Sequence, residues 1–195
     1  MRIYALKQAV PAGVLDARTE FFSDAYAPMA FQNGLILSYD QFPPETKEIV
    51  YKSLLSKPDA LQALIEWGFT DKDEQIQQYL LCTQAILDNN NPDIDENGVL
   101  QEAEYVPCDR RGGACEYEGI ICSKLKLKNG SATPMETKVL TKVGQLRLDK
   151  EICDELGIKQ PTLRTHKDRL FIKTGMSRKE GLVKVAHEFN LVNHD

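Results

Sequence analysis

The sequence predicts a mainly α-helical protein, with a helical N-terminal domain, a cysteine-containing irregular segment and a C-terminal domain of four helices. Two observations favour this class. Apolar residues recur at helical spacing in several windows, and Pro, Thr, Asp and Gly stand where these windows begin and end. We therefore place the domain boundaries at residues 1–105, 106–130 and 131–195.

The composition excludes several classes of protein. The chain has 195 residues, 42% hydrophobic and 27% charged, which is typical of globular domains. It contains no apolar run of the ~18–20 residues that a membrane span needs. Its first residues lack the apolar stretch and cleavage site of a secretory signal. We expect a cytoplasmic protein that does not contact a membrane, and no enzyme, because no nucleophile and base can be paired.

Charge is unevenly distributed along the chain. The whole sequence has 24 Lys and Arg against 29 Asp and Glu, a net charge of -5. Residues 131–195 hold 12 against 9, or +3, and residues 1–130 hold 12 against 20, or -8. Such asymmetry favours contact with nucleic acid through the C-terminal part.

Three helices are expected in the N-terminal domain. They are predicted to begin at Pro44, Pro58 and Asp71, and the last is predicted to run to about Asp88. Residues 1–43 contain several aromatic residues but show no clear period. We interpret this domain as an input or assembly module that senses a signal or binds a partner protein.

The C-terminal helices are marked by their ends. Thr133 and Glu136 fit a capping box, and Pro134 suits the first helical position. The remaining helices are predicted from Asp149 to Leu156, from about Pro161 to about Lys173, and onward from Ser177 as a cap.

The second and third of these helices form a helix-turn-helix pattern. A turn of a few residues that contains Gly157 joins them. In such a pair, side chains at the start of the later helix reach base edges in the major groove of DNA. The alternative is a small helical domain with a solvated charged face.

Four linked motifs carry a resemblance to a known family. They are Thr133-Pro134-x-Glu136-x-x-Val139-Leu140, Lys150-Glu151-Ile152-Cys153-x-x-Leu156-Gly157-Ile158, Thr162-Leu163-Arg164-Thr165-His166 and Lys173-Thr174-Gly175-Met176-Ser177. Together they resemble the LuxR/GerE-type DNA-binding domain over residues 131–190, about a third of the chain. The chain departs from that pattern at Leu146, Cys153, Asp168 and Thr174, where the family often has Gly, Ala, a neutral or basic residue, and Leu.

The resemblance implies roles for particular side chains. Base-reading residues would be Arg164, Thr165 and Asp168, and phosphate-contacting residues would be Lys150, Lys159, His166, Lys167, Arg169 and Lys173. His166 equally fits a partly buried residue that supports the helix.

The resemblance thus implies a sequence-specific transcription regulator that binds double-stranded DNA, and it also implies that the fourth helix pairs two protomers as a homodimer. The alternative is a phage or mobile-element interaction or assembly protein that uses the helix-turn-helix fold as a protein-binding module.

Three cysteines suggest a further possibility. Cys108, Cys115 and Cys122 are separated by six residues each in a Gly-containing stretch, and three thiolates with a fourth ligand would suit Zn²⁺. The alternatives are buried structural thiols or a redox-dependent disulfide. A metal- or redox-responsive switch is therefore a lower alternative function. Cys82 and Cys153 are expected to be buried thiols.

Residues 93–104 match a calcium-binding loop. Asp93, Asp95, Asn97 and Glu104 occupy liganding positions, and Gly98 occupies the turn position. The competing interpretation is a polar turn or short hairpin with Asn97-Gly98 at its tip.

Overall fold

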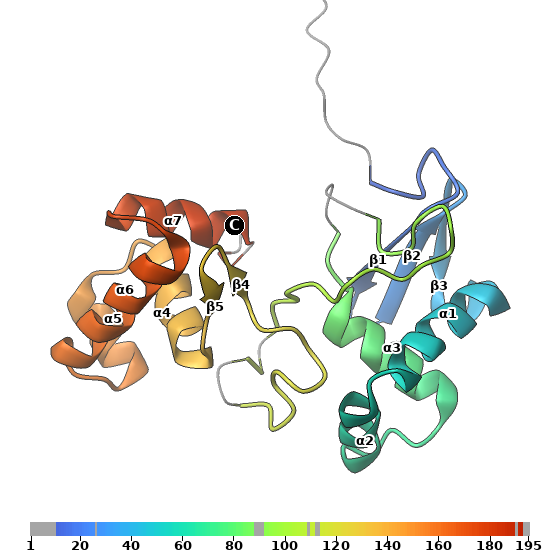
Figure 1. Cartoon of the computed structure of the whole chain (residues 1–195), viewed down its shortest axis with the longest axis horizontal. Coiled ribbons are helices and arrows are strands. Elements are labelled where there is room, and N and C mark those ends of the chain that lie inside the picture. Colours follow the sequence, from blue (N-terminus) through green and yellow to red (C-terminus); the bar gives the residue numbers. More distant parts are fainter. Residues whose placement is uncertain are drawn as a thin grey trace, which may run out of the picture. The chain divides into compact units, whose positions relative to one another are not determined.

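The computed structural model describes residues 11–25, 27–87, 92–108, 110–111, 114–189 and 191–192. It divides the chain into two compact units. Unit 1 comprises Met1–Val106 and Ile120–Cys122, and unit 2 comprises Pro107–Gly119 and Ser123–Asp195. Figure 1 labels the helices and strands of both units in chain order.

Unit 1 contains a β-sheet that the sequence analysis did not predict. Strands β1 (Thr19–Asp24), β2 (Ala27–Gln32) and β3 (Leu35–Ser38) pair antiparallel in the order β1-β2-β3. The prediction of a mainly α-helical protein with a helical N-terminal domain is therefore wrong, because this unit combines helices and strands.

The turn between β2 and β3 is the local signal that could have identified the sheet. Asn33 and Gly34 have φ of 51° and 76°, and Gln32 pairs with Leu35 across them. Asn-Gly at such a two-residue turn is a strong hairpin signal. The strands are too short for their alternation to stand out, although Phe21 and Ala30 are fully buried opposite each other.

Three helices follow the sheet of unit 1 along the chain. A 3₁₀ turn over Tyr39–Gln41 precedes them, and the helices are α1 (Pro44–Leu55), α2 (Pro58–Glu66) and α3 (Lys72–Thr83). All three begin at or next to the predicted residues. Helix α3 ends earlier than predicted, and the predicted end, Asp88, lies outside the described residues.

The core of unit 1 lies around α3. This helix packs against α1 and α2 and against β1 and β2. Its start is fixed by Asp71, whose side chain accepts hydrogen bonds from the backbone N–H groups of Asp73 and Glu74. Ile76 and Leu80 are fully buried on its inner face.

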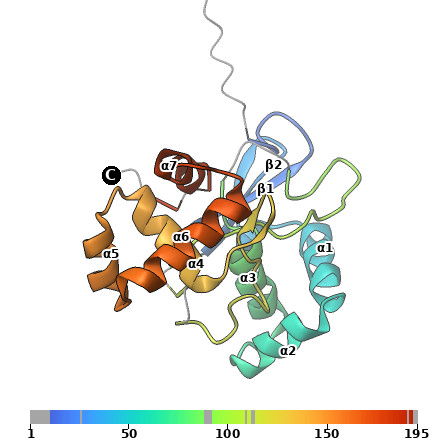
Figure 2. The same cartoon turned by 60° about the vertical axis from the view of Figure 1, so that its left-hand side comes forward.

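Unit 2 contains a short hairpin and four helices. The strands are β4 (Lys126–Leu127) and β5 (Gly130–Ser131), and the helices are α4 (Pro134–Gly144), α5 (Asp149–Leu156), α6 (Gln160–Thr174) and α7 (Lys179–Glu188). Each helix begins within one residue of its predicted start. Helix α4 packs against α6 and α7, and α5 packs against α6 (Figure 2).

None of the helices in the described part of the chain has the length and apolar character needed to cross a bilayer.

Candidate nucleic-acid interface

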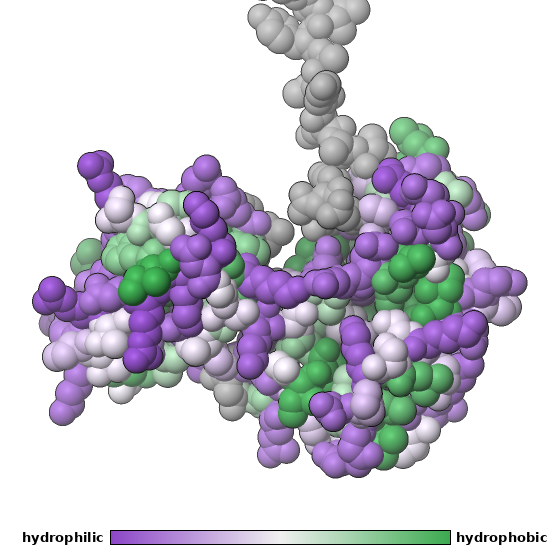
Figure 3. Space-filling view, in the orientation of Figure 1, coloured by the Kyte–Doolittle hydropathy of each residue, from purple (hydrophilic) through white to green (hydrophobic). Residues whose placement is uncertain are grey.

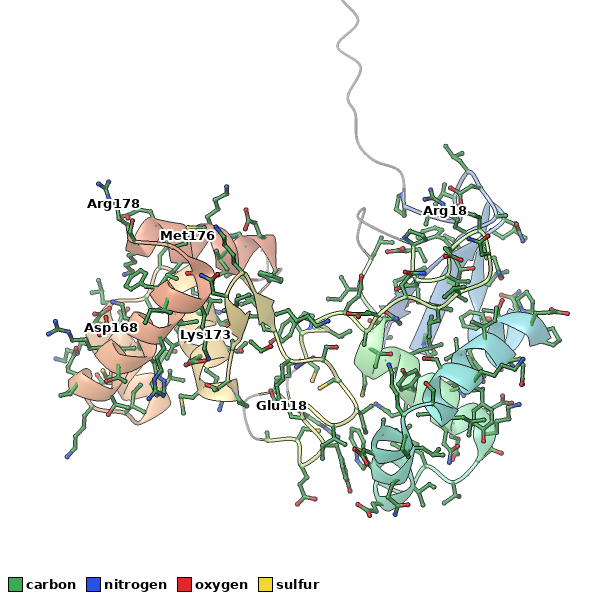
Figure 4. The ribbon with its side chains drawn as sticks, in the orientation of Figure 1. Arg18, Glu118, Asp168, Lys173, Met176 and Arg178 are labelled. Atoms are coloured by element: carbon green, nitrogen blue, oxygen red, sulfur yellow. The ribbon has the colours of Figure 1, made fainter. Side chains whose placement is uncertain are left out.

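A buried ion pair holds the start of α4 against the end of α6. Thr133 Oγ1 accepts from the Glu136 N–H, and Glu136 Oε2 accepts from the Thr133 N–H, which forms the predicted capping box. The same Oε2 lies 2.6 Å from Lys173 Nζ, so Lys173 turns toward α4 (Figure 4). The Glu136 side chain is only 1% exposed.

The Glu136 carboxylate is kept charged in this setting. Burial acts to raise its pKa, but hydrogen bonds from Lys173 and Thr133 and the charge of Lys173 outweigh that effect. The net result is a pKa below the ordinary value for glutamate. Lys173 therefore serves as the counter-charge of a buried carboxylate.

The turn between α4 and α5 carries a strained residue. Leu146 has φ of 59°, in the left-handed region that disfavours side chains with a Cβ. Its side chain is 68% exposed, so burial of the leucine gives little in return. The resemblance predicts Gly at this position, and Gly would adopt this φ without the Cβ penalty.

A left-handed glycine makes the turn between α5 and α6. Gly157 has φ of 63°, and the N–H groups of Gly157 and Ile158 both donate to Cys153 O. Helix α6 then begins at Gln160, with Pro161 in its first turn. Leu163 and Leu170 are buried on its inner side, which leaves the opposite side exposed.

The residues with predicted base-reading roles share that exposed side. Arg164, Thr165 and Asp168 are all exposed on α6. The Thr165 hydroxyl donates to Pro161 O at 3.0 Å, and Asp168 is labelled in Figure 4. Neither Arg164 nor Asp168 forms an ion pair with any residue that the structure describes, so both remain accessible to a ligand.

The lysines and arginines with predicted phosphate contacts fall into two groups. Lys167 Nζ donates to both carboxylate oxygens of Asp149, each at 3.0 Å, and Lys173 pairs with Glu136. These two are internally paired cations. The others are exposed and form no ion pair with a described residue, and we call them, together with Arg164, the unpaired cations: Lys150, Lys159, Arg164 and Arg169.

His166 differs in its surroundings from the exposed cations. Its side chain is half-buried on α6, and its Nδ1 is buried with no hydrogen-bond partner among the described residues. This placement agrees with the alternative of a partly buried histidine better than with a phosphate contact.

No metal site is found at the cysteines. All five lie in the described part of the chain and form no disulfide. Across the described residues, no group of three or more His, Cys, Asp or Glu side chains is arranged to hold a metal ion. The zinc site suggested by Cys108, Cys115 and Cys122 is therefore not seen in this part of the chain.

The calcium-loop residues serve the fold of unit 1. Asp93 Oδ2 accepts from the Phe21 N–H at 2.6 Å, which fastens this segment to β1. Asp95 Oδ1 accepts from the N–H groups of Asn97 and Val99, each at 2.9 Å. The Glu104 N–H donates to Thr83 O, and the described residues 92–108 contain no helix.

This geometry is that of the turn with Asn97-Gly98 at its tip. Ile94 forms an antiparallel bridge with Leu100, and Gly98 has φ of 74°. The two carboxylates, Asp93 and Asp95, are occupied by backbone N–H groups of the chain itself.

The comparisons with known proteins add no relative. No family model matches the chain, and no curated protein and no solved structure matches it either. The case for a DNA-binding surface therefore rests on the motifs and on the geometry around α6.

Proposed function

We propose that the protein is a sequence-specific DNA-binding transcription regulator that uses α5 and α6 as a LuxR-type helix-turn-helix. Helix α6 would enter the major groove, and unit 1 would sense a signal or bind a partner protein. Two protomers would bind as a homodimer.

The unpaired cations are the observation that carries this proposal. Lys150 and Lys159 lie at the start of α5 and just before α6, and Arg164 and Arg169 lie on α6. Lys and Arg that neutralise phosphates release condensed counterions from DNA, which drives binding at low salt. A cation that is already paired with a carboxylate of the fold contributes less to this counterion release. The presence of the unpaired cations beside the internally paired ones therefore supports an external anionic ligand.

The exposed side of α6 also suits base readout. Arg164 lies in the first half of the helix, which is the part that a helix-turn-helix presents to base edges. A guanidinium donates two hydrogen bonds to guanine, and a carboxylate such as that of Asp168 accepts from the amino group of cytosine.

Selection of duplexes from a random-sequence library by the folded full-length chain tests the proposal. We expect an enriched sequence, and a homodimer predicts that it contains two related half-sites. Failure of the well-folded chain to retain any duplex at low salt would contradict the proposal.

A second candidate function is favoured by Ile172. This residue is 71% exposed near the end of α6, and Figure 3 shows hydrophobic side chains among the hydrophilic ones on the visible face of unit 2. An assembly protein of a phage or mobile element would use this side of α6 to bind protein. A photo-crosslinking side chain at position 172, tested with random duplex, separates the two: DNA adducts favour groove binding, and their absence favours a protein interface.

A further inference from the structure

The β4–β5 hairpin is fixed to the end of the candidate recognition helix. The Asn129 N–H donates to Lys173 O at 2.7 Å, and Asn129 Nδ2 donates to Ile172 O at 2.9 Å. The last carbonyls of a helix lack partners within the helix, so Asn129 caps α6 from a separate segment of the chain. Figure 2 shows the hairpin beside this end of α6.

The hairpin carries lysines on one side and leucines on the other. Lys124, Lys126 and Lys128 alternate with Leu125 and Leu127, and alternate residues of a strand share a face. Leu125 is buried, whereas all three lysines are exposed. The ladder extends beyond the two strands, because the Ala132 N–H donates to Leu125 O.

All charged residues in this segment are basic. Residues 123–131 contain three lysines and no Asp or Glu. Residues 123–195, which include the hairpin and the four helices, hold 15 Lys and Arg against 9 Asp and Glu, or +6. The hairpin therefore doubles the +3 of residues 131–195.

The hydrogen bonds that join the hairpin to α6 come from Asn129. A fold that needed only a helix cap at this place would be satisfied by Asn129. Lys124 and Lys128 are exposed and form no ion pair with a described residue. Both ammonium groups can therefore bind an anion outside the fold.

The length of α6 places the hairpin at a phosphate backbone. The helix has 15 residues and is therefore about 22 Å long, against a major groove about 12 Å wide. When the start of a helix of this length reads base edges, its end reaches the backbone that borders the groove, as the recognition helix of homeodomains does. The hairpin lies at that end.

We propose that the β4–β5 hairpin is a second DNA-contacting element, in which Lys124 and Lys128 bind the phosphate backbone beside the groove that α6 enters. This inference rests on the proposed function of α6. It adds sequence-independent phosphate contacts, which strengthen binding and fix the orientation of the helix without reading bases.

Two charge-matched double variants of the full-length chain test the hairpin. The first is Lys124→Gln with Lys128→Gln, and the matched control is Lys138→Gln on α4 with Lys184→Gln on α7. Affinity for a random-sequence duplex is measured over a range of salt concentrations. Each lost phosphate contact lowers the salt slope by about 0.9.

We expect the hairpin variant to lower the slope by about 1.8 and the control to leave it nearly unchanged. Circular dichroism and the thermal midpoint check that both variants remain folded. Equal slope changes in the two variants would overturn the hairpin role, because net charge alone would then explain binding, and so would no change in either.

The two proposals fail in different ways. If the wild-type chain retains duplex and Arg164→Ala changes its base preference while the hairpin variant has a normal slope, only the hairpin role is wrong. If the wild-type chain shows no salt-dependent retention of duplex, the proposed function and the hairpin role are both wrong.

Discussion

The two units of the molecule have opposite charge. Unit 1 holds 7 Lys and Arg against 17 Asp and Glu, a net charge of -10, and unit 2 holds 17 against 12, a net charge of +5. The total of -5 therefore conceals a basic unit. An acidic unit repels DNA, so the charge of unit 1 favours contact through unit 2 alone.

The units also use their cations differently. Of the five described Lys and Arg residues of unit 1, four contact a carboxylate or a tyrosine of the same unit: Arg18, Lys47, Lys57 and Lys72. Unit 2 pairs five cations in the same way, Lys142, Arg147, Lys167, Lys173 and Lys184, but leaves the unpaired cations exposed around α6. Among the described residues, both units therefore use cations within the fold, and unit 2 has a surplus near one helix that is consistent with the proposed anionic ligand.

Breaking an internally paired cation should have the largest effect. Lys173→Met leaves the buried Glu136 carboxylate without its counter-charge, and we expect unit 2 to lose about 3–5 kcal/mol of stability. Hydrogen exchange of the amides in α4 and α6 measures this loss. Trp67 is the single tryptophan and lies in unit 1. Its fluorescence therefore reports the unfolding of unit 1, and Lys173→Met should leave that transition where it is in wild type.

The double variant Glu136→Gln with Lys173→Met should recover much of that stability, because the buried charge is then gone. Unchanged exchange in Lys173→Met would contradict the assignment of Lys173 to the fold and return it to the group of candidate phosphate contacts.

Acid should remove the contribution of the same ion pair. The pKa of Glu136 is lower in the folded chain than in the unfolded chain, where it is about 4.3. Its stabilisation is therefore complete above about pH 4.3 and is lost as the pH falls through the folded pKa. Exchange of unit 2 in wild type and Glu136→Gln, followed from neutral pH to acid, should converge at the acid end; a constant difference would count against the pair.

Removing an unpaired cation should affect recognition and leave the fold intact. Arg164→Ala should lose about 1–3 kcal/mol of discrimination at one base position. Binding of a selected duplex and its single-base variants measures this loss. Lys184→Ala, whose partner Glu188 is an exposed neighbour on α7, is the control and should discriminate normally. Uniform weakening across all sequences would instead make Arg164 a phosphate contact.

Relief of the strained turn should have a small and opposite effect. Leu146→Gly should stabilise unit 2 by about 0.5–1 kcal/mol, because Gly adopts positive φ without the Cβ penalty and the exposed leucine packs little. Leu146→Ala keeps the Cβ and should give no gain. Equal stabilisation by Gly and Ala in thermal unfolding would show that exposure of the leucine, not backbone strain, sets its cost.

The sequence predicted local features better than long-range contacts. The starts of α4 to α7 followed from caps, prolines and glycines that act within a few residues. The sheet of unit 1 was missed although Asn33-Gly34 marked a hairpin, because strands of four to six residues show little periodicity. The partners of Lys167 and Lys173 lie 18 and 37 residues away, and no local pattern identifies such pairs.

The most direct test of the central claim compares one unpaired with one internally paired cation. Lys159→Gln and Lys167→Gln change the charge equally, and the salt dependence of random-duplex binding is measured for each full-length variant. The account predicts that Lys159→Gln lowers the salt slope by about 0.9 while Lys167→Gln keeps the wild-type slope. A lowered slope in Lys167→Gln with an unchanged slope in Lys159→Gln would contradict it.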